Sequence, residues 1–311
     1  NGTGDIFGII EKIDYLADTL GVDAIWLSPF YKSPFADFGY DVADYCDVDP
    51  IFGTLADFDE LVKEAHARNI KIIVDWVPNH SSDQHKWFIE SRSSRDNPKR
   101  DWYNWKDAKM DENGERQPPN NWYSLFGGIA WEWDEKTQQY YQHSFLKEQP
   151  DLNWRNPEVK EAMFETIRFW LERGVDGFRV DVAQYIMKDP EFRDNPPNDP
   201  DASAFHRPHG DYDSQIHLYD VNHPDTHKIY REFRQILDEY SEKAPRMAVG
   251  EIHLFEYTEL VKYYGTPENG LEFHMPFNFS LLNADWDAQQ FKKLIDEYEA
   301  ALPKWANPNY V

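Results

Sequence analysis

An arginine and two carboxylates in this chain stand where they could catalyse a reaction together. Arg179 and Asp181 are two residues apart in an apolar stretch that predicts a strand, so their side chains face the same side. A neighbouring guanidinium lowers the pKa of a carboxyl group and keeps it ionised, as a nucleophile must be. Glu251 follows Val249 and Gly250, and we expect an apolar wall to raise its pKa so that it acts as a general acid. Glycoside hydrolysis requires two carboxyl groups whose pKa values are shifted in opposite directions.

Each of these residues also has a purely structural interpretation. An Arg-x-Asp pair is often a buried ion pair, and Glu251 could be an exposed residue at the end of a strand. Aromatic residues make up 16% of the chain and include 12 Trp, which suits binding of sugar faces but equally suits an ordinary core. The side chains alone therefore leave the reaction open.

The elements that must position these residues alternate between strand and helix. Three segments, 20–27, 68–75 and 173–181, each place Gly or Asn after a helical stretch and then run into an apolar strand. Gly and Asn tolerate the left-handed backbone of a helix C-terminus, and continuous apolar strands suit a parallel sheet buried on both faces. Further strands are predicted at 247–251 and 271–275, and helices after Thr54, after Asn156-Pro157, at 226–240 and at 257–264. The pattern predicts an α/β fold with polar groups gathered at the carboxyl ends of the strands.

Two stretches interrupt this alternation. Residues 81–148 are too long for a loop and too rich in Trp for a linker, so we interpret them as a small inserted domain. Residues 189–224 are rich in Pro, Asp, Asn and His without periodicity, which fits either solvated surface or the rim of a pocket. Residues 309–311 could begin a sixth strand. A closed barrel needs eight strands, so we expect either an open sheet or a partial chain.

Composition and charge exclude several classes of protein. The 311 residues carry 57 acidic and 32 basic side chains, a net charge of −25, and this field repels nucleic acid and anionic membranes. No apolar run approaches the roughly 20 residues that a membrane span needs. The single cysteine, Cys46, cannot form an internal disulfide, and with no leader sequence visible at Asn1 we expect a cytoplasmic protein. Neither a nucleic-acid nor a membrane partner is expected, and the oligomeric state is left open.

Four motifs, in order and spacing, resemble the α-amylase family of glycoside hydrolases. They are DWVPNH at 75–80, QPDLN at 149–153, GFRVD at 177–181 and VGE at 249–251. Further segments at 121–122, 126–128 and 139–141 are similar to the α-glucosidase and oligo-1,6-glucosidase branch. The resemblance implies a (β/α)8 TIM barrel, incomplete in this chain, with a small domain inserted after the third barrel strand. Its parts would be 1–80 and 149–311 for the barrel and 81–148 for the insertion.

The resemblance also implies roles for individual residues. Asp181 is similar to the nucleophile of the family, Glu251 to its acid/base, and Arg179 to the arginine that orients the nucleophile. The implied substrate-binding residues are Asp37, Tyr40, His80, Phe126, Phe145, Gln149 and Arg179. Asp37 and Tyr40 would grip and stack beneath the non-reducing glucose, with two phenylalanines as pocket walls and Gln149 near the pocket entrance.

Two further implications concern specificity and a metal ion. Val182 is the residue type that accompanies α-1,6 activity in this branch, although packing also explains a valine on a buried strand. Asn1, Thr3 and Asp5 resemble the end of a loop that binds a structural calcium or magnesium ion. No cofactor is expected for the chemistry itself.

Taken as a whole, the resemblance predicts a retaining, exo-acting α-glucosidase that hydrolyses short maltose- or isomaltose-type oligosaccharides, with sucrose also a candidate substrate. A transglucosidase of the same family and a catalytically silent binding relative are the alternatives. The third acidic residue of the family, the first barrel strand and the last two would fall outside this chain, which we therefore interpret as a partial sequence.

Overall fold

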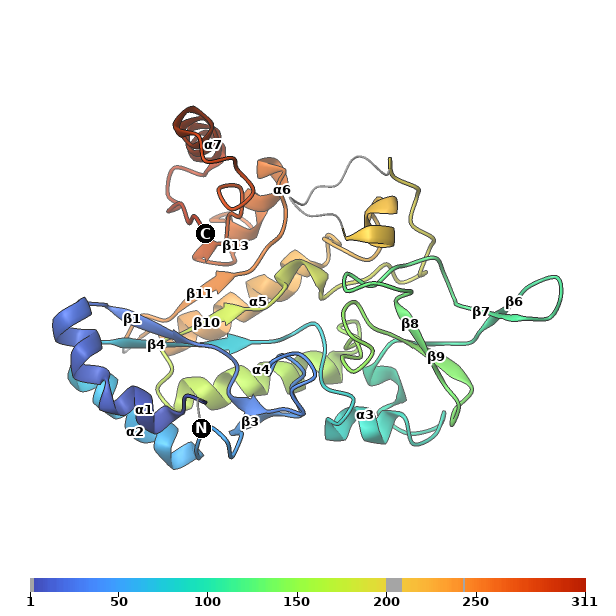
Figure 1. Ribbon diagram of the computed structural model, residues 1–311, viewed down its shortest axis with the longest axis horizontal. Coiled ribbons are helices and arrows are strands. Elements are labelled where there is room, and N and C mark those ends of the chain that lie inside the picture. The colour runs from blue at the N-terminus through green and yellow to red at the C-terminus, as the bar shows by residue number, and fades with distance from the viewer. Residues whose placement is uncertain (1–2, 200–208, 243) are drawn as a thin grey trace.

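The centre of the molecule is a five-stranded parallel sheet with the strand order β1-β4-β10-β11-β14 (Figure 1). The structure is a computed structural model that describes residues 3–199, 209–242 and 244–311. The strands of this sheet are β1 (Ala24–Leu27), β4 (Lys71–Trp76), β10 (Gly177–Val180), β11 (Met247–Gly250) and β14 (Met275–Pro276). All four pairings are parallel, so the carboxyl ends of the strands share one edge.

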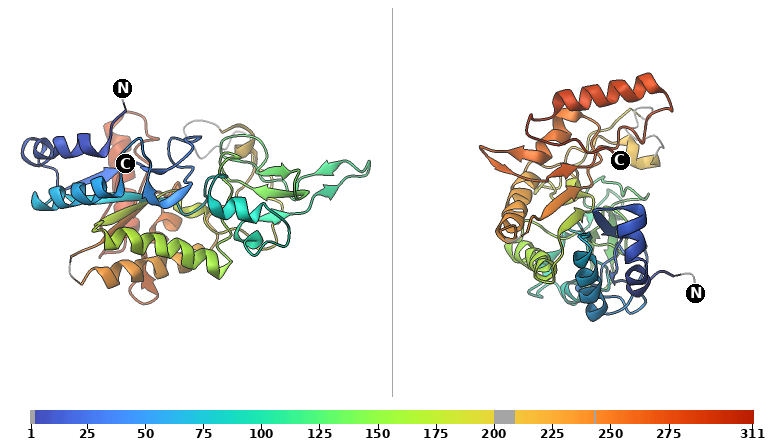
Figure 2. Two further views of the ribbon diagram at one scale, coloured as in Figure 1. Left: turned by 90° about the horizontal axis from the view of Figure 1, so that it is seen from below. Right: turned by 90° about the vertical axis from the view of Figure 1, so that its left-hand side faces the viewer.

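The helices lie around the outer side of this sheet (Figure 2). The three predicted left-handed positions before the strands are confirmed: Gly21, Asn69 and Gly174 have φ angles of 66°, 60° and 93°. Thr54 forms a capping box with Asp57 at the start of its helix, as the sequence predicts for a cap at this position. The helical elements on this side are α1 (Ile6–Glu11), the π-helix η1 (Tyr15–Leu20), α2 (Leu55–Ala67), α4 (Pro157–Glu172) and α5 (Thr226–Tyr240).

The C-terminal part differs from the expected pattern. The strand expected at 271–275 is wrong as a single element, because Leu271 belongs to an antiparallel hairpin and only Met275 enters the central sheet. Between them, Glu272 turns inward and is held by His227 and Arg231, so the chain leaves the hairpin before it joins the sheet. The helix expected at 257–264 is divided into α-helical and 3-10 parts. The elements here are α6 (Tyr257–Leu260), η5 (Val261–Tyr264), β12 (Gly265–Thr266), β13 (Gly270–Leu271) and α7 (Ala288–Ala301).

Residue Tyr310 forms a parallel bridge with Asn278 directly after β14. The bridge agrees with a strand beginning at 309–311. No described helix is both long enough and apolar enough to cross a membrane.

The stretch 81–148 contains small elements of its own, and its hairpin β6-β7 projects away from the rest of the chain (Figure 1). Trp122, Trp131 and Tyr140 form a small separate core there, whereas Phe88 and Tyr103 pack into the main core. The division of the chain at 81 and 148 therefore stays a prediction. The elements are α3 (Lys86–Ser91), η2 (Arg100–Trp102), β5 (Trp105–Lys106), β6 (Lys109–Met110), β7 (Arg116–Gln117), β8 (Trp131–Asp134) and β9 (Gln139–Gln142).

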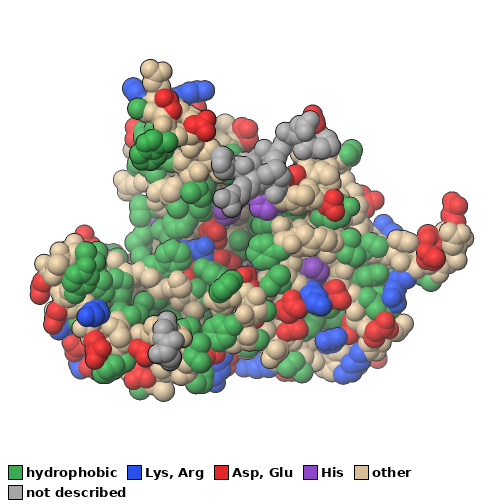
Figure 3. All heavy atoms as spheres, viewed as in Figure 1, with side chains coloured by type: hydrophobic (Ala, Val, Ile, Leu, Met, Phe, Trp, Pro, Cys, Tyr) green, Lys and Arg blue, Asp and Glu red, His purple; other side chains and the backbone are tan. Residues whose placement is uncertain are grey.

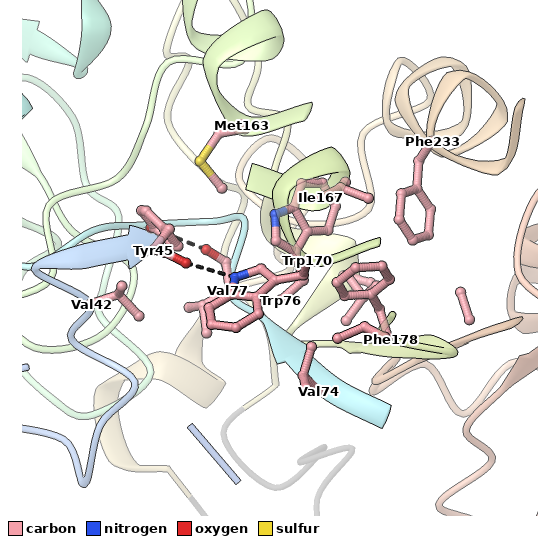
Figure 4. Close-up of a cluster of buried hydrophobic side chains, with 14 of the residues drawn as sticks. Val42, Tyr45, Val74, Trp76, Val77, Met163, Ile167, Trp170, Phe178 and Phe233 are labelled. Atoms are coloured by element: carbon pink, nitrogen blue, oxygen red, sulfur yellow. Dashed lines mark hydrogen bonds between the residues drawn. The ribbon is translucent and has the colours of Figure 1, made fainter. Parts of the chain in front are cut away.

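The main core is aromatic and lies between the central sheet and helices α4 and α5 (Figure 4). Trp76 of β4 stacks on Phe233 of α5 with ring centroids 5.2 Å apart. Trp170 of α4 donates its indole N–H to the carbonyl of Tyr45 at 2.8 Å, so this buried polar group is satisfied. The contact ties the helix to β3 (Asp44–Val48), which pairs with β2 (Tyr31–Lys32). This packing fixes the strands whose ends carry the site.

A buried carboxylate stabilises the opposite end of the sheet. Asp176, directly before β10, accepts from the backbone N–H of Ile72 at 3.0 Å, forms ion pairs with Lys71 and Arg246, and lies 2.6 Å from Nε2 of His66. Its side chain is 3% exposed, so removing it leaves the side chains of His66, Lys71 and Arg246 and one backbone N–H without this partner.

We therefore expect Asp176→Ala to lower the free energy of unfolding by about 3 kcal/mol, measured by urea denaturation. The matched control is Asp59→Ala, which removes a half-exposed partner of Arg173 and should change stability by less than about 1 kcal/mol. Equal effects of the two substitutions would contradict this role for Asp176.

Candidate active site

A cavity of about 380 Å³ lies at the carboxyl ends of β4, β10 and β11. On the face shown in Figure 3, a hollow contains basic, acidic and histidine side chains. Nine of the ten predicted substrate-binding, catalytic and specificity residues line the cavity. The tenth, Gln149, lies behind them. The lining residues are Asp37, Tyr40, His80, Leu125, Phe126, Phe145, Arg179, Asp181, Val182, Tyr185, His209, Glu251 and His253.

Arg179 is the centre of this site because three carboxylates bind its guanidinium. Nη1 lies 2.6 Å from Asp181 and 2.7 Å from Asp75, and Nη2 lies 2.6 Å from Glu251. The sheet register explains the arrangement: Arg179 is the Cα partner of Asp75 on β4 and of Val249 on β11, and residues paired across strands share a face. One buried cation is therefore shared by a cluster of three carboxyl groups.

The pKa directions of the two candidate catalytic carboxyl groups are the reverse of those expected from the sequence. Burial, together with the negative charges of Glu251 and Asp75, raises the pKa of Asp181 above its ordinary value in spite of Arg179. Burial also acts to raise the pKa of Glu251, but the hydrogen bond from His253 and the charge of Arg179 outweigh it and lower the pKa to about 2. The expected apolar wall around Glu251 is wrong, because polar groups contact both of its oxygens.

Val182 contributes one of these contacts through an unusual backbone. Its φ of 36° is a left-handed conformation that β-branched residues rarely adopt. In this conformation its N–H donates to Oε2 of Glu251 at 3.1 Å. The residue predicted to influence linkage specificity thus also holds the carboxylate of Glu251, and its effect on specificity stays a prediction.

A buried glutamine lies behind two residues of the cavity lining. Gln149 donates its amide to Oδ2 of Asp37 at 2.9 Å and lies 3.0 Å from Nε2 of His80. Its side chain is fully buried, so the expectation that it stands near the entrance is wrong; it positions Asp37 and His80 from behind. Burial lowers the pKa of His80 to about 4, so this imidazole is neutral at pH 7 and suited to binding an uncharged hydroxyl.

Aromatic side chains form the wall on the side of the inserted stretch. Phe126 and Phe145 make an edge-to-face contact with centroids 5.4 Å apart, and Tyr185 packs on Phe145. Phe126 is 54% exposed whereas Phe145 is buried, which places Phe126 at the outer part of the wall. His209, from the irregular stretch 189–224, also lines the cavity, so this stretch contributes to the pocket rim as one of the two interpretations predicted.

Sequence reasoning assigned no role to several residues that the structure brings to the site. Asp75 and His253 lie in strand-end segments where polar groups were expected, and that position was the available signal. Leu125 and His209 come from irregular segments and Tyr185 from a short 3-10 turn, where no periodicity marks a residue as facing a pocket.

The implied metal site lies at the start of the chain, where Asn1 is outside the described residues. Asp5 is the N-cap of α1, and its carboxylate accepts from the N–H of Gly8 at 2.7 Å. In residues 3–199, 209–242 and 244–311, no cluster of three or more His, Cys, Asp or Glu side chains is arranged to hold a metal. Since calcium takes roughly six to eight oxygen ligands, Thr3 and Asp5 are too few by themselves, and the metal stays a prediction.

The family model of the alpha-amylase catalytic domain matches residues 1–307. The chain belongs to the alpha-amylase family. It is 45% identical to a probable alpha-glucosidase of Rhizobium meliloti, over 100% of this chain and 56% of the relative. An oligo-1,6-glucosidase of Parageobacillus thermoglucosidasius is 43% identical over 98% of this chain and 51% of its own length. The chain thus spans about half the length of these curated relatives.

A solved structure of an alpha-glucosyl transfer enzyme, XgtA, has a TM-score of 0.91 at 42% identity and covers 100% of this chain and 56% of its own. Among alpha-amylase family members the catalytic domain is a (β/α)8 barrel, so the expected incomplete barrel is confirmed by the five parallel strands and the helices around them.

The raised pKa of Asp75 predicts how the free energy of unfolding depends on pH. Burial raises this pKa to about 6 against the lowering effect of Arg179, whereas the unfolded chain titrates near 3.9. The native state therefore binds more protons than the unfolded state between these values, and the contribution of Asp75 to stability falls as pH rises through that window. We expect Asp75→Asn to remove about 3 kcal/mol of this pH dependence, measured as urea unfolding at pH 4 to 7. A slope unchanged by the substitution would contradict the assignment.

Proposed function

We propose that the protein is a retaining, exo-acting α-glucosidase that hydrolyses short α-glucosides such as maltose and isomaltose. The observation that carries this proposal is the convergence of Asp181 and Glu251 on Arg179 within the cavity. Binding to one guanidinium keeps the two carboxylates close together. This closeness favours direct attack by a carboxylate over the wider, water-filled gap of inverting enzymes.

The reaction proceeds in two displacements. Asp181 attacks the anomeric carbon and forms a β-glucosyl-enzyme while Glu251 gives a proton to the departing oxygen. Glu251 then takes a proton from water as the water attacks the same carbon, which releases α-glucose and frees Asp181. The first step needs the proton on Glu251 rather than on Asp181. Positive charge that develops on the sugar beside Asp181 favours its ionised form and so supports this distribution.

A polar group of residues at the cavity supports exo action. Asp37 and His80 line the cavity and offer polar groups to the hydroxyls of one terminal glucose, while Gln149 holds both of them from behind. An uncharged wall of phenylalanines beside them suits a sugar face. Such a pocket takes the non-reducing end of a short oligosaccharide, which is the partner we propose.

The stereochemistry of the first product tests this function. Proton NMR of p-nitrophenyl α-glucoside hydrolysis by the full-length protein should show α-glucose before β-glucose appears by mutarotation. Release of β-glucose first would rule out the double displacement, and absence of any glucose release would rule out the activity.

Transfer of glucose to a sugar hydroxyl is the second candidate function. It is favoured by the similarity to XgtA, an alpha-glucosyl transfer enzyme, and to an isomaltulose synthase of Protaminobacter rubrum at 38% identity and a TM-score of 0.84. The same Asp181 intermediate serves both reactions, because only the acceptor differs. The ratio of free glucose to transfer product at rising sugar concentration distinguishes them.

A catalytically silent binding relative is less well supported, since such a protein has no need to keep Asp181, Glu251 and Arg179 in mutual contact. We propose no cofactor for the chemistry, and Val182 remains our candidate for a preference for α-1,6 linkages. Comparing kcat/KM for isomaltose and maltose in Val182→Thr tests that preference, which should shift toward maltose.

A further inference from the structure

His253 contacts the carboxylate oxygen of the proposed acid/base that Arg179 does not bind. Its Nε2 lies 3.1 Å from Oε1 of Glu251, and its ring stacks on Phe279 with centroids 4.1 Å apart and an interplanar angle of 5°. The stacked ring limits rotation of the imidazole, and the side chain is only 28% exposed. Contacts with both Glu251 and Phe279 therefore hold the His253 ring in place.

The two oxygens of Glu251 have different surroundings. Oε2 is bound by the Arg179 guanidinium at 2.6 Å and by the N–H of Val182 at 3.1 Å. Oε1 has His253 as its contact, and His253 lines both the catalytic cavity and a neighbouring cavity of about 520 Å³. Since a cation and an N–H hold Oε2 as an anion, Oε1 is the oxygen suited to carry a proton to a leaving group.

The backbone around this contact is held in place as well. In the amide orientation that satisfies both groups, Gln184 donates to the carbonyl of Glu251 at 3.1 Å and accepts from the N–H of His253 at 3.2 Å. Gln184 is buried and belongs to the 3-10 turn η3 (Ala183–Tyr185) that follows β10. The side chain of Gln184 therefore fixes the backbone spacing between Glu251 and His253.

We propose that His253 is a positioning residue that assists proton transfer from Glu251 to the leaving group, an inference that rests on the proposed function. Its Nε2–H donates to Oε1 of Glu251. As the proton leaves Oε1 for the glycosidic oxygen, negative charge grows on Oε1 and the hydrogen bond from His253 strengthens. His253 itself keeps its proton, so the bond that breaks is O–H on Glu251 and the bond that forms is O–H on the leaving group.

The dependence on the leaving group tests this role. In the full-length protein, His253→Phe keeps an aromatic ring over Phe279 but loses the N–H donor. We expect it to lower kcat/KM for methyl α-glucoside, whose leaving group needs a proton, by roughly 10- to 100-fold. For α-glucosyl fluoride, whose fluoride leaves without full protonation, kcat/KM should fall less than about threefold. The matched variant His253→Gln retains an N–H donor and should recover most of the activity on methyl α-glucoside.

Three outcomes distinguish this proposal from its alternatives. An equal fall for both substrates, or no recovery in His253→Gln, would assign His253 a structural role and overturn the proposal. Wild-type protein that fails to hydrolyse α-glucosyl fluoride would instead overturn the proposed function. The expected outcome is selective loss for the poor leaving group, with recovery by glutamine and unchanged thermal unfolding.

Discussion

Azide should restore catalysis to Asp181→Ala and to Glu251→Ala with opposite stereochemistry. Without its nucleophile, Asp181→Ala in the full-length protein should lose at least about 10⁴-fold in kcat/KM for p-nitrophenyl α-glucoside. Azide fits the space left by the carboxylate and attacks from the β face, so the product is β-glucosyl azide. Glu251→Ala still forms the glucosyl-enzyme from this activated substrate, and azide then attacks from the α face to give α-glucosyl azide. The anomeric configuration of each glucosyl azide is measured by NMR.

The stereochemistry of the two azide products shows which of Asp181 and Glu251 is the nucleophile and which is the acid/base, whatever their pKa values. In the ligand-free site Glu251 has the lower pKa and Asp181 the higher one, so an exchange of roles between them is the alternative to test. Exchanged stereochemistry, with α-azide from Asp181→Ala and β-azide from Glu251→Ala, would make Glu251 the nucleophile. Asp225→Ala, which removes a half-exposed partner of Arg155, is the control and should leave hydrolysis unchanged.

Arg179→Met should have the largest combined effect on activity and stability. The substitution removes the cation that Asp75, Asp181 and Glu251 share, so two buried carboxyl groups and one largely buried carboxyl group lie close together without it. Removing one partner from a buried ion pair destabilises a protein by about 3–5 kcal/mol, and we expect that loss in urea unfolding at pH 7. Hydrolysis should fall below detection, because repulsion favours protonation of Asp181 and so removes the nucleophile.

The pH dependence separates this electrostatic effect from loss of packing. Carboxyl groups with raised native pKa values bind protons before the unfolded chain does, so the stability of Arg179→Met should recover as pH is lowered from 7 to 5. A loss that is constant over this range would indicate packing alone. Arg168→Met on the exposed face of α4 is the control, since its pairs with Glu161 and Glu165 are solvated and contribute less than about 1 kcal/mol.

Local signals in the sequence predicted helices α2, α4 and α5 and strands β1, β4, β10 and β11 of the central sheet. The capping box at Thr54, the Asn156-Pro157 start of α4 and the glycine that ends it at Gly174 act through the backbone of their own neighbourhood, so no distant contact is needed to recognise them. The strand at 271–275 failed because its apolar pattern is interrupted by Glu272. Distant residues, His227 and Arg231, satisfy that buried carboxylate and turn the chain there.

The sequence by itself determined that the polar residues at the strand ends enter the site, because parallel strands carry their final residues to one edge. Asp181 and Glu251 meet there on Arg179, as their strand positions predict. Only the tertiary structure decided the protonation of these groups. The pKa of a carboxyl group depends on every charge and N–H around it, and the register of β4 adds Asp75 while the turn after β11 adds His253. Asp75 and His253 come from separate segments of the chain, so they reach the catalytic carboxyl groups only when the sheet forms.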